Sequence, residues 1–122
     1  MPAFVVQQHD QPHTTHWDFM LEQPDSDRLA TWQIPLAPEQ WSTHPLDCTR
    51  IFDHRRKYLT YAGPLSDDRG HVHPVDHGSC ELLESNPDLC LLRLHGQTLC
   101  GTLLLMRKID AFWQLTFTGD SQ

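Results

Sequence analysis

Residues that could hold a divalent cation lie near the start of the chain, in the segment His16-Trp17-Asp18. If residues 16–22 form a β-strand, His16 and Asp18 point to one face, because successive side chains of a strand point to opposite faces. An imidazole and a carboxylate placed in this way can bind one cation if a third ligand converges on them. His9 is the nearest candidate for that ligand, so the sequence predicts a metal site formed by His9, His16 and Asp18.

The same alternation gives the two faces of this strand different roles. Met20 and Glu22 continue the face of the candidate ligands, whereas the opposite face carries the large apolar side chains Trp17, Phe19 and Leu21. We therefore expect one face to pack in the core and the other to border a groove. Surface strands often alternate in this way without binding anything, so the pattern needs support from other parts of the chain.

Composition indicates one folded domain spanning residues 1–122, because a chain of this length can bury an adequate core without metal or disulfide staples. The formal charge of −7 argues against non-specific coating of nucleic acid, which depends on Lys and Arg. It does not exclude a small basic site. The densest basic cluster runs from Arg50 to Lys57 and surrounds His54, a second candidate for chemistry.

The chain also lacks the signals of membrane insertion and secretion. No apolar run approaches the ~20 residues that a spanning helix needs, and the first residues include no basic segment followed by a long apolar one. We therefore expect a cytoplasmic protein with no membrane partner. In that compartment the cysteines are reduced, and we expect buried thiols at Cys48, Cys80, Cys90 and Cys100.

Short strand-like segments recur along the chain and predict an all-β fold, a small closed or partly open β-barrel. The expected strands are 3–8, 16–22, 29–34, 59–62, 80–83, 89–94, 99–107 and 112–118. Turn-forming residues separate them, including residues 76–78 and a tight hairpin at 95–98. Residues 35–49 carry three prolines and predict a long loop, and residues 103–106 fit either a buried strand or a short helix.

Several motifs in order resemble the 3'-phosphoesterase module of bacterial DNA ligase D. They are Phe-Val-Val-Gln-Gln-His-Asp at 4–10, His-Trp-Asp-Phe at 16–19, Leu-Glu at 21–22, Trp-x-Ile-Pro at 32–35 and Asp-His-x-x-x-Tyr at 53–58. The resemblance covers the chain from residue 4 to about residue 81, and the last third matches only as a pattern of strands.

This resemblance implies a barrel with a crescent-shaped groove that holds Mn²⁺, although other divalent cations also suit such ligands. It implies a phosphomonoesterase and phosphodiesterase that removes 3'-phosphates and 3'-ribonucleosides from the ends of DNA or an RNA–DNA primer. His9, His16 and Asp18 would hold the metal, and His54 and Tyr58 would contact the scissile phosphate. A separate ligase or polymerase would be a partner, because the chain is too short to contain either.

Two positions depart from the family pattern. Met20 stands where the ligase modules carry a phosphate-gripping arginine, and a thioether cannot replace a forked guanidinium. Arg55 or Arg56 could supply the missing charge. The spacing from His9 to His16 is also one residue longer than expected, which a loop at residues 12–13 could absorb.

Two other functions stay open. The first is a non-catalytic relative that keeps the cation but only binds nucleic-acid ends or a protein partner. The second is a non-haem iron oxygenase, since His16, Asp18 and a distal His54 would form a facial triad of two histidines and one carboxylate.

Overall fold

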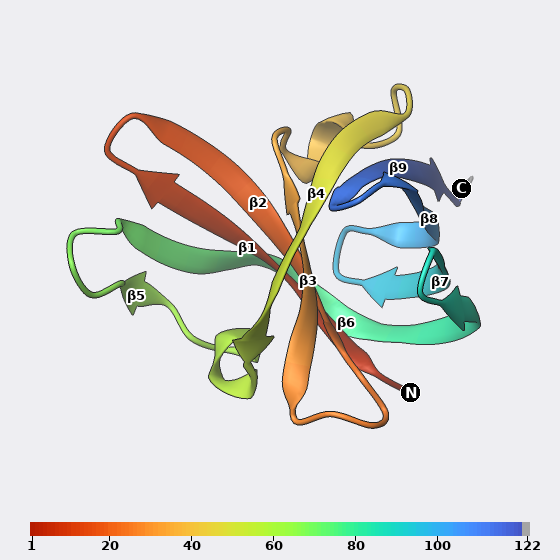
Figure 1. The fold of residues 1–122 in the computed structure, drawn as a ribbon, viewed down its shortest axis with the longest axis horizontal. Coiled ribbons are helices and arrows are strands. Elements are labelled where there is room, and N and C mark those ends of the chain that lie inside the picture. Colours follow the sequence, from red (N-terminus) through yellow and green to blue (C-terminus); the bar gives the residue numbers. More distant parts are fainter. Residues whose placement is uncertain (121–122) are drawn as a thin grey trace.

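The computed structural model describes residues 1–120 and consists almost entirely of β-strands (Figure 1). Its nine strands are β1 (Ala3–Gln11), β2 (Thr14–Glu22), β3 (Arg28–Ile34), β4 (Leu46–Arg55), β5 (Gly63–Pro64), β6 (His71–Asn86), β7 (Leu89–Gly96), β8 (Cys100–Ile109) and β9 (Phe112–Gly119). Two short 3-10 helices, η1 (Pro38–Gln40) and η2 (Arg56–Leu59), flank β4. Within residues 1–120, no helix is both long enough and apolar enough to cross a membrane.

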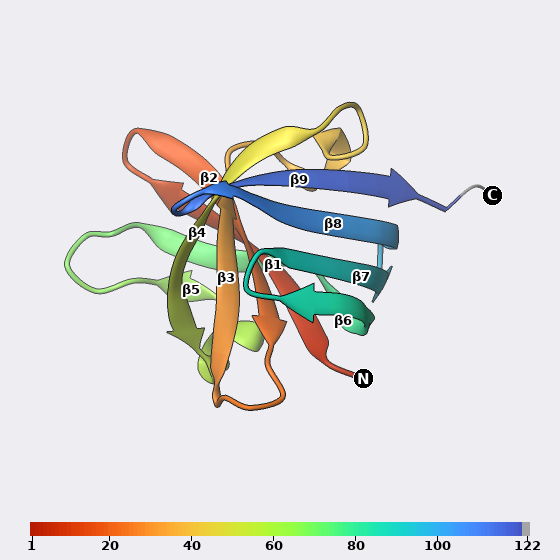
Figure 2. The same ribbon diagram turned by 45° about the vertical axis from the view of Figure 1, so that its right-hand side comes forward.

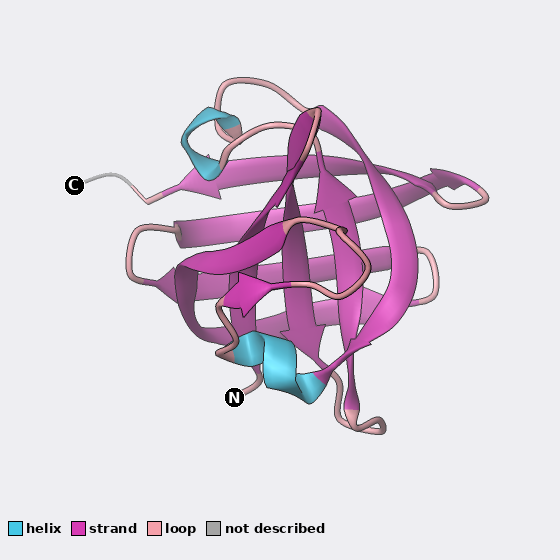
Figure 3. Cartoon of the chain, turned by 90° about the vertical axis from the view of Figure 1, so that its left-hand side faces the viewer, coloured by secondary structure: helices cyan, strands magenta, loops and turns pink. Residues whose placement is uncertain are grey.

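The strands form a ring, which confirms the predicted fold class. Eight strands follow one another in the order β1-β2-β3-β4-β9-β8-β7-β6, and pairing of β1 with β6 closes the ring. The short β5 pairs with β6 outside this ring. All pairings are antiparallel. The arrangement is that of a partly open barrel, and both 3-10 helices lie at its periphery (Figure 3).

Two long strands connect the two halves of the ring. Residues 49–55 of β4 pair with β3, whereas residues 46–49 pair with β9. In the same way, residues 71–79 of β6 pair with β1 and residues 78–86 pair with β7. In Figure 2, β7, β8 and β9 run in a direction crosswise to that of β3.

The strand β2 has two different faces, as its alternation predicts. Phe19 and Leu21 belong to the main core, which also contains Trp32 and Leu103. Met20, on the opposite face, packs with two buried neighbours in a second, smaller apolar cluster. Those neighbours are Val5 and Leu29, and the partly buried Tyr58 and Leu59 cover them.

Two predictions about elements near β4 are wrong. Residues 59–62 form no strand, because the backbone turns after η2, where the Lys57 carbonyl accepts hydrogen bonds from the amides of Thr60 and Tyr61. Residues 35–49 are not a loop throughout, since β4 begins at Leu46. The earlier part of that segment is anchored by Trp41, whose buried indole donates a hydrogen bond to the Leu36 carbonyl over 2.8 Å.

The predicted turn at residues 76–78 is also wrong, because these residues lie inside β6. The Asp76 carboxylate is buried and accepts hydrogen bonds from three backbone amides at 2.8, 3.2 and 2.8 Å. Those amides belong to Gln97, Thr98 and Leu99 in the hairpin between β7 and β8, which the sequence did predict. Asp76, a residue type common in turns, therefore lies in a strand and stabilises a turn that is distant in the sequence. Residues 103–106, left open between strand and helix, belong to β8.

Three of the four cysteines are buried as expected, and Cys100 is exposed. Burial raises the pKa of the thiol to about 12 at Cys48 and Cys90 and to about 11 at Cys80. These three side chains are therefore protonated packing groups at neutral pH.

Candidate metal centre and groove

The hairpin of β1 and β2 brings the candidate ligands to one place. Residues 12–13 form a tight turn, and the register beyond it places His9 directly opposite His16. Residues that face each other across an antiparallel pair project to the same side of the sheet. Asp18 is two residues beyond His16 and shares that side. The seven-residue spacing between the histidines is therefore the spacing that this two-residue loop requires.

Ligand atoms of the three side chains converge. His9 Nδ1 lies 3.1 Å from His16 Nε2, and His16 Nε2 lies 3.4 Å from Asp18 Oδ1. One ligand atom from each residue lies within 4.8 Å of the others. His16 and Asp18 are buried, whereas His9 is half-buried. The sequence had singled out these three residues, and the structure brings them together.

A backbone carbonyl from a distant turn orients His9. His9 Nε2 lies 2.7 Å from the carbonyl oxygen of Arg69. A carbonyl only accepts, so Nε2 carries the proton, and in the neutral ring Nδ1 keeps a lone pair directed at the group. The turn packs closely on β1 at Gly70, where φ is +88° and a Cβ would lie 1.9 Å from the Asp10 carbonyl oxygen. The sequence analysis did not predict this contact with His9.

The donor set fits a divalent cation. Asp18 is 3% exposed, and its Oδ1 has no hydrogen-bond partner among the described residues. A buried carboxylate oxygen without a partner is unfavourable unless it binds a charge or a metal. Two imidazole nitrogens and one carboxylate oxygen are a ligand set that suits Mn²⁺, Zn²⁺ or Fe²⁺.

A cavity of about 590 Å³ lies beside this group and collects the other candidate residues. Its lining includes His9, Asp18, Met20, His54 and Tyr58. We call this cavity the groove. The rings of His54 and Tyr58 meet edge to face, with their centroids 5.8 Å apart. The oxygenase alternative requires His54 to be the third metal ligand beside His16 and Asp18. Within residues 1–120 the third member of the metal group is His9, and His54 does not belong to it.

His54 has a fixed ring orientation. Its Nδ1 lies 3.0 Å from the Phe52 carbonyl oxygen, so Nδ1 is the donor of this hydrogen bond and Nε2 is the other, exchangeable nitrogen. Burial lowers the pKa of His54 below its ordinary value of 6.5, and the negative charge of Asp18 partly opposes this effect. The imidazole is therefore mainly neutral at pH 7.

Gln7 holds the Tyr58 segment and was missed by the sequence analysis. Its fully buried side chain donates hydrogen bonds from Nε2 to the carbonyls of Tyr58 and Tyr61 over 2.7 and 2.9 Å. These bonds tie the residues around η2 to β1. Gln7 stands two residues before His9 on the same strand, and this shared face is the signal that could have identified it.

The comparison with known families agrees with this geometry. The family model of the DNA Ligase D 3'-phosphoesterase domain matches residues 7–107. The chain belongs to this family. The match spans the metal group, His54 and Tyr58, and it confirms the resemblance found in the sequence. The comparison with curated proteins found no matching relative.

In this phosphoesterase-family chain, eight of the nine lysine and arginine residues fall into two groups; the ninth, Lys108, belongs to neither. One group is paired with acidic side chains and consists of Arg50, Arg56, Arg93 and Arg107. The other lines the groove, has no acidic partner within residues 1–120, and consists of Arg28, Arg55, Lys57 and Arg69. A chain with a formal charge of −7 thus concentrates unpaired positive charge at the groove. Such an arrangement attracts anions.

The position of the family arginine is closed to solvent in this chain. Met20 lines the groove but is only 1% exposed, because it is packed in the second apolar cluster. Of the two arginines considered as substitutes, Arg56 pairs with Glu22, whereas Arg55 lines the groove. Arg55 also faces Arg28 across β3 and β4. Like charges in that arrangement repel each other unless an anion bridges them.

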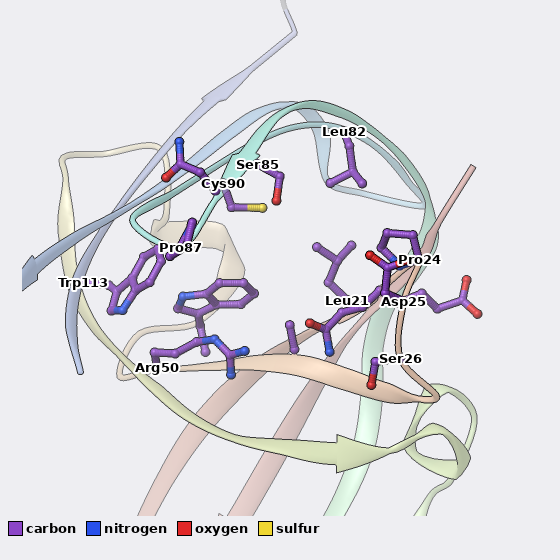
Figure 4. Close-up of a pocket in the computed structure, with 15 residues that line it drawn as sticks. Leu21, Pro24, Asp25, Ser26, Arg50, Leu82, Ser85, Pro87, Cys90 and Trp113 are labelled. Atoms are coloured by element: carbon purple, nitrogen blue, oxygen red, sulfur yellow. The ribbon is translucent and has the colours of Figure 1, made fainter. Parts of the chain in front are cut away.

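A second cavity, of about 510 Å³, lies on the core side of β2 (Figure 4). Leu21, Trp113 and Arg50 line it, and the Arg50 guanidinium lies 4.9 Å from the centroid of the Trp32 ring. None of the three candidate metal ligands contributes to it. Because Leu21 and Met20 project to opposite faces of β2, the strand separates this cavity from the groove.

Proposed function

We propose that this phosphoesterase-family chain is a Mn²⁺-dependent 3'-phosphoesterase, acting as one domain over residues 1–122. It removes 3'-phosphates and 3'-ribonucleosides from the ends of DNA or an RNA–DNA primer. The observation that carries the proposal is the buried, unpartnered Oδ1 of Asp18 beside two histidines, in a groove lined by unpaired cations. The product is a 3'-hydroxyl, so a separate ligase or polymerase is the class of enzyme that would use it.

His9 Nδ1, His16 Nε2 and a carboxylate oxygen of Asp18 would hold the cation. When bound, the cation supplies a Lewis acid that draws charge from phosphoryl oxygens. The protein fixes the ligands in advance: the Arg69 carbonyl orients His9, and burial holds His16 and Asp18. This preorganisation lets the ligands act without rearrangement.

His54 is the candidate for proton transfer. Its hydrogen bond to the Phe52 carbonyl fixes the ring and leaves Nε2 to meet the substrate. A bound phosphate is an anion and favours the protonated imidazole, which offsets the effect of burial on its pKa. Nε2 then donates its proton to a phosphate oxygen or to the leaving 3'-oxygen. Tyr58, held by Gln7, orients the phosphate.

Arg28 and Arg55 are the candidates for the phosphate clamp that Met20 does not provide. They face each other at the groove, and neither has an acidic partner in the described part of the chain. Two guanidinium groups in this arrangement can donate charge-assisted hydrogen bonds to one phosphate.

The test is an assay of metal-stripped protein supplemented with Mn²⁺ on a 3'-phosphate oligonucleotide. We expect release of inorganic phosphate, and no release in EDTA or from the Asp18→Asn variant. A 5'-phosphate oligonucleotide is the matched control and should stay intact. Absence of phosphate release from the wild type under these conditions would rule out the proposed activity on 3'-phosphates.

A non-catalytic relative is the second candidate, and the enclosed Met20 at the family arginine position favours it. Such a protein would bind both Mn²⁺ and the 3'-phosphate oligonucleotide without releasing phosphate. Binding and turnover measured on the same preparation distinguish the two functions.

A further inference from the structure

Phe52 is an aromatic side chain that the fold leaves in water. It is 74% exposed, the most exposed of the large apolar side chains in residues 1–120. It also lines the groove, together with His54 and Tyr58. A phenyl ring in this position adds nothing to either apolar cluster. A single exposed apolar side chain is ordinary by itself, so it is the position of this ring in the groove that points to a role in binding.

An irregularity in the sheet places Phe52 there. Pairing between β3 and β4 shifts register, because Thr31 faces Ile51 whereas Leu29 faces His54. Residues 52–53 of β4 therefore stand against Ala30 alone. Bulges of this kind change the direction of side chains and often border functional sites.

The Phe52 ring is stacked on His54. The two rings are nearly parallel, with an interplanar angle of 6° and centroids 4.7 Å apart. The imidazole therefore covers one face of the phenyl ring. Because the side chain is 74% exposed, the other face is open to a planar ligand.

The surroundings of this ring match a nucleic-acid strand. The groove beside it carries the unpaired cations Arg28, Arg55, Lys57 and Arg69. Proteins that bind single strands combine cations along the phosphate backbone with aromatic rings on which bases stack. Only one sugar separates the base of a 3'-terminal nucleotide from its 3'-phosphate. A phosphate at His54 therefore carries its base into the neighbourhood of Phe52.

We propose that Phe52 is the stacking platform for the unpaired 3'-terminal base of the substrate strand. The placement of that base rests on the proposed function, which locates the 3'-phosphate at His54. Phe52 is then a specificity-determining residue, since an end that has lost its terminal base gains nothing from the ring.

The test compares binding of two single strands in Mn²⁺, one with a normal 3'-terminal nucleotide and one with an abasic 3'-terminal nucleotide. Both are DNA strands that end in a non-hydrolysable 3'-phosphonate, which keeps the anion for His54 and prevents turnover. We expect Phe52→Ala to weaken binding of the normal strand by about tenfold, as for the loss of one base–aromatic stack, and to leave the abasic strand unaffected. Phe52→Trp should restore the preference. Phe112→Ala removes an exposed ring outside the groove, 61% exposed, and should change neither.

Equal weakening on both strands would overturn the proposal, because Phe52 would then act only by supporting His54. Equal binding of the two strands by the wild type, or no measurable binding, would overturn it as well. Failure of the proposed function has a different signature: the wild type releases no phosphate from a 3'-phosphate strand, while its preference for a terminal base and the effect of Phe52→Ala persist. Circular dichroism of Phe52→Ala checks that the variant is folded.

Discussion

Asp76 and Asp18 are both buried carboxylates, yet their surroundings differ completely. Asp76 accepts three hydrogen bonds from backbone amides of the β7–β8 hairpin. Asp18 has a buried Oδ1 without a hydrogen-bond partner in the described residues and two histidines beside it. Burial alone therefore does not identify a functional carboxylate. The unsatisfied Oδ1 of Asp18 next to two histidines distinguishes it from Asp76, because a buried carboxylate oxygen usually has a hydrogen-bond partner or binds a cation.

The same difference extends to the regions around the two residues. Asp76 connects β6 to the hairpin next to it, so its hydrogen bonds stabilise the ring of strands. The groove near Asp18 contains cations without an acidic partner in the described residues, and the exposed Phe52, which belongs to neither apolar cluster. Unfavourable features of this kind persist where they serve a function.

The largest effect on stability should come from Asp76→Ala. This substitution leaves three backbone amides without their acceptor, and we expect the free energy of unfolding to fall by about 3 kcal/mol. Urea denaturation followed by tryptophan fluorescence measures it. The folded variant should still bind Mn²⁺ as the wild type does. A stability loss below about 1 kcal/mol would show that the hairpin is held by other contacts.

His54→Ala should affect turnover and spare metal binding. Because the side chain is assigned to proton transfer and not to the metal group, we expect kcat on a 3'-phosphate strand to fall by about 100-fold. Mn²⁺ affinity should stay near the wild-type value. Phe112→Ala is the control for removal of an exposed ring. Unchanged turnover in His54→Ala would exclude this residue from the chemistry.

Asp18→Asn should change stability little in the absence of metal. The substitution removes a buried charge whose Oδ1 has no hydrogen-bond partner within residues 1–120, so we expect the free energy of unfolding in EDTA to stay within about 1 kcal/mol of the wild type. Denaturation in EDTA of Asp18→Asn and Asp76→Asn side by side sharpens the contrast between the two carboxylates. A large loss in Asp18→Asn would mean that Asp18 is structural as well.

The smallest effect is on the titration of His54. Burial lowers its pKa and the Asp18 carboxylate raises it, so Asp18→Asn should lower the pKa of His54 further. NMR titration of the imidazole in metal-free protein measures both values. The neutral form should predominate above pH 6.5 in both proteins, and protonation should require a lower pH in the variant. An unchanged pKa would indicate that the two side chains do not interact.

The sequence predicted those parts of the site that depend on local periodicity. Alternation along residues 16–22 gave the correct faces of β2. His9 was chosen as the nearest further ligand, and the register that pairs it with His16 was not predicted. The family motifs supplied His54 and Tyr58, which line the groove beside His9 and Asp18.

The remaining features depend on contacts between distant residues. The Arg69 carbonyl reaches His9 across 60 positions, and Gln7 reaches Tyr58 across 51. Asp76 is a typical turn former that accepts its hydrogen bonds from a turn 21 or more positions away. The secondary-structure propensity of neighbouring residues carries no information about such pairs, since only the folded arrangement of the strands brings them together.

The most direct test of the account is calorimetric titration of Mn²⁺ into metal-stripped wild type, Asp18→Asn and Asp76→Asn. We expect one Mn²⁺ site in the wild type and in Asp76→Asn, and no measurable site in Asp18→Asn. Mn²⁺ binding by Asp18→Asn with wild-type affinity would contradict the claim that His9, His16 and Asp18 together form the metal site.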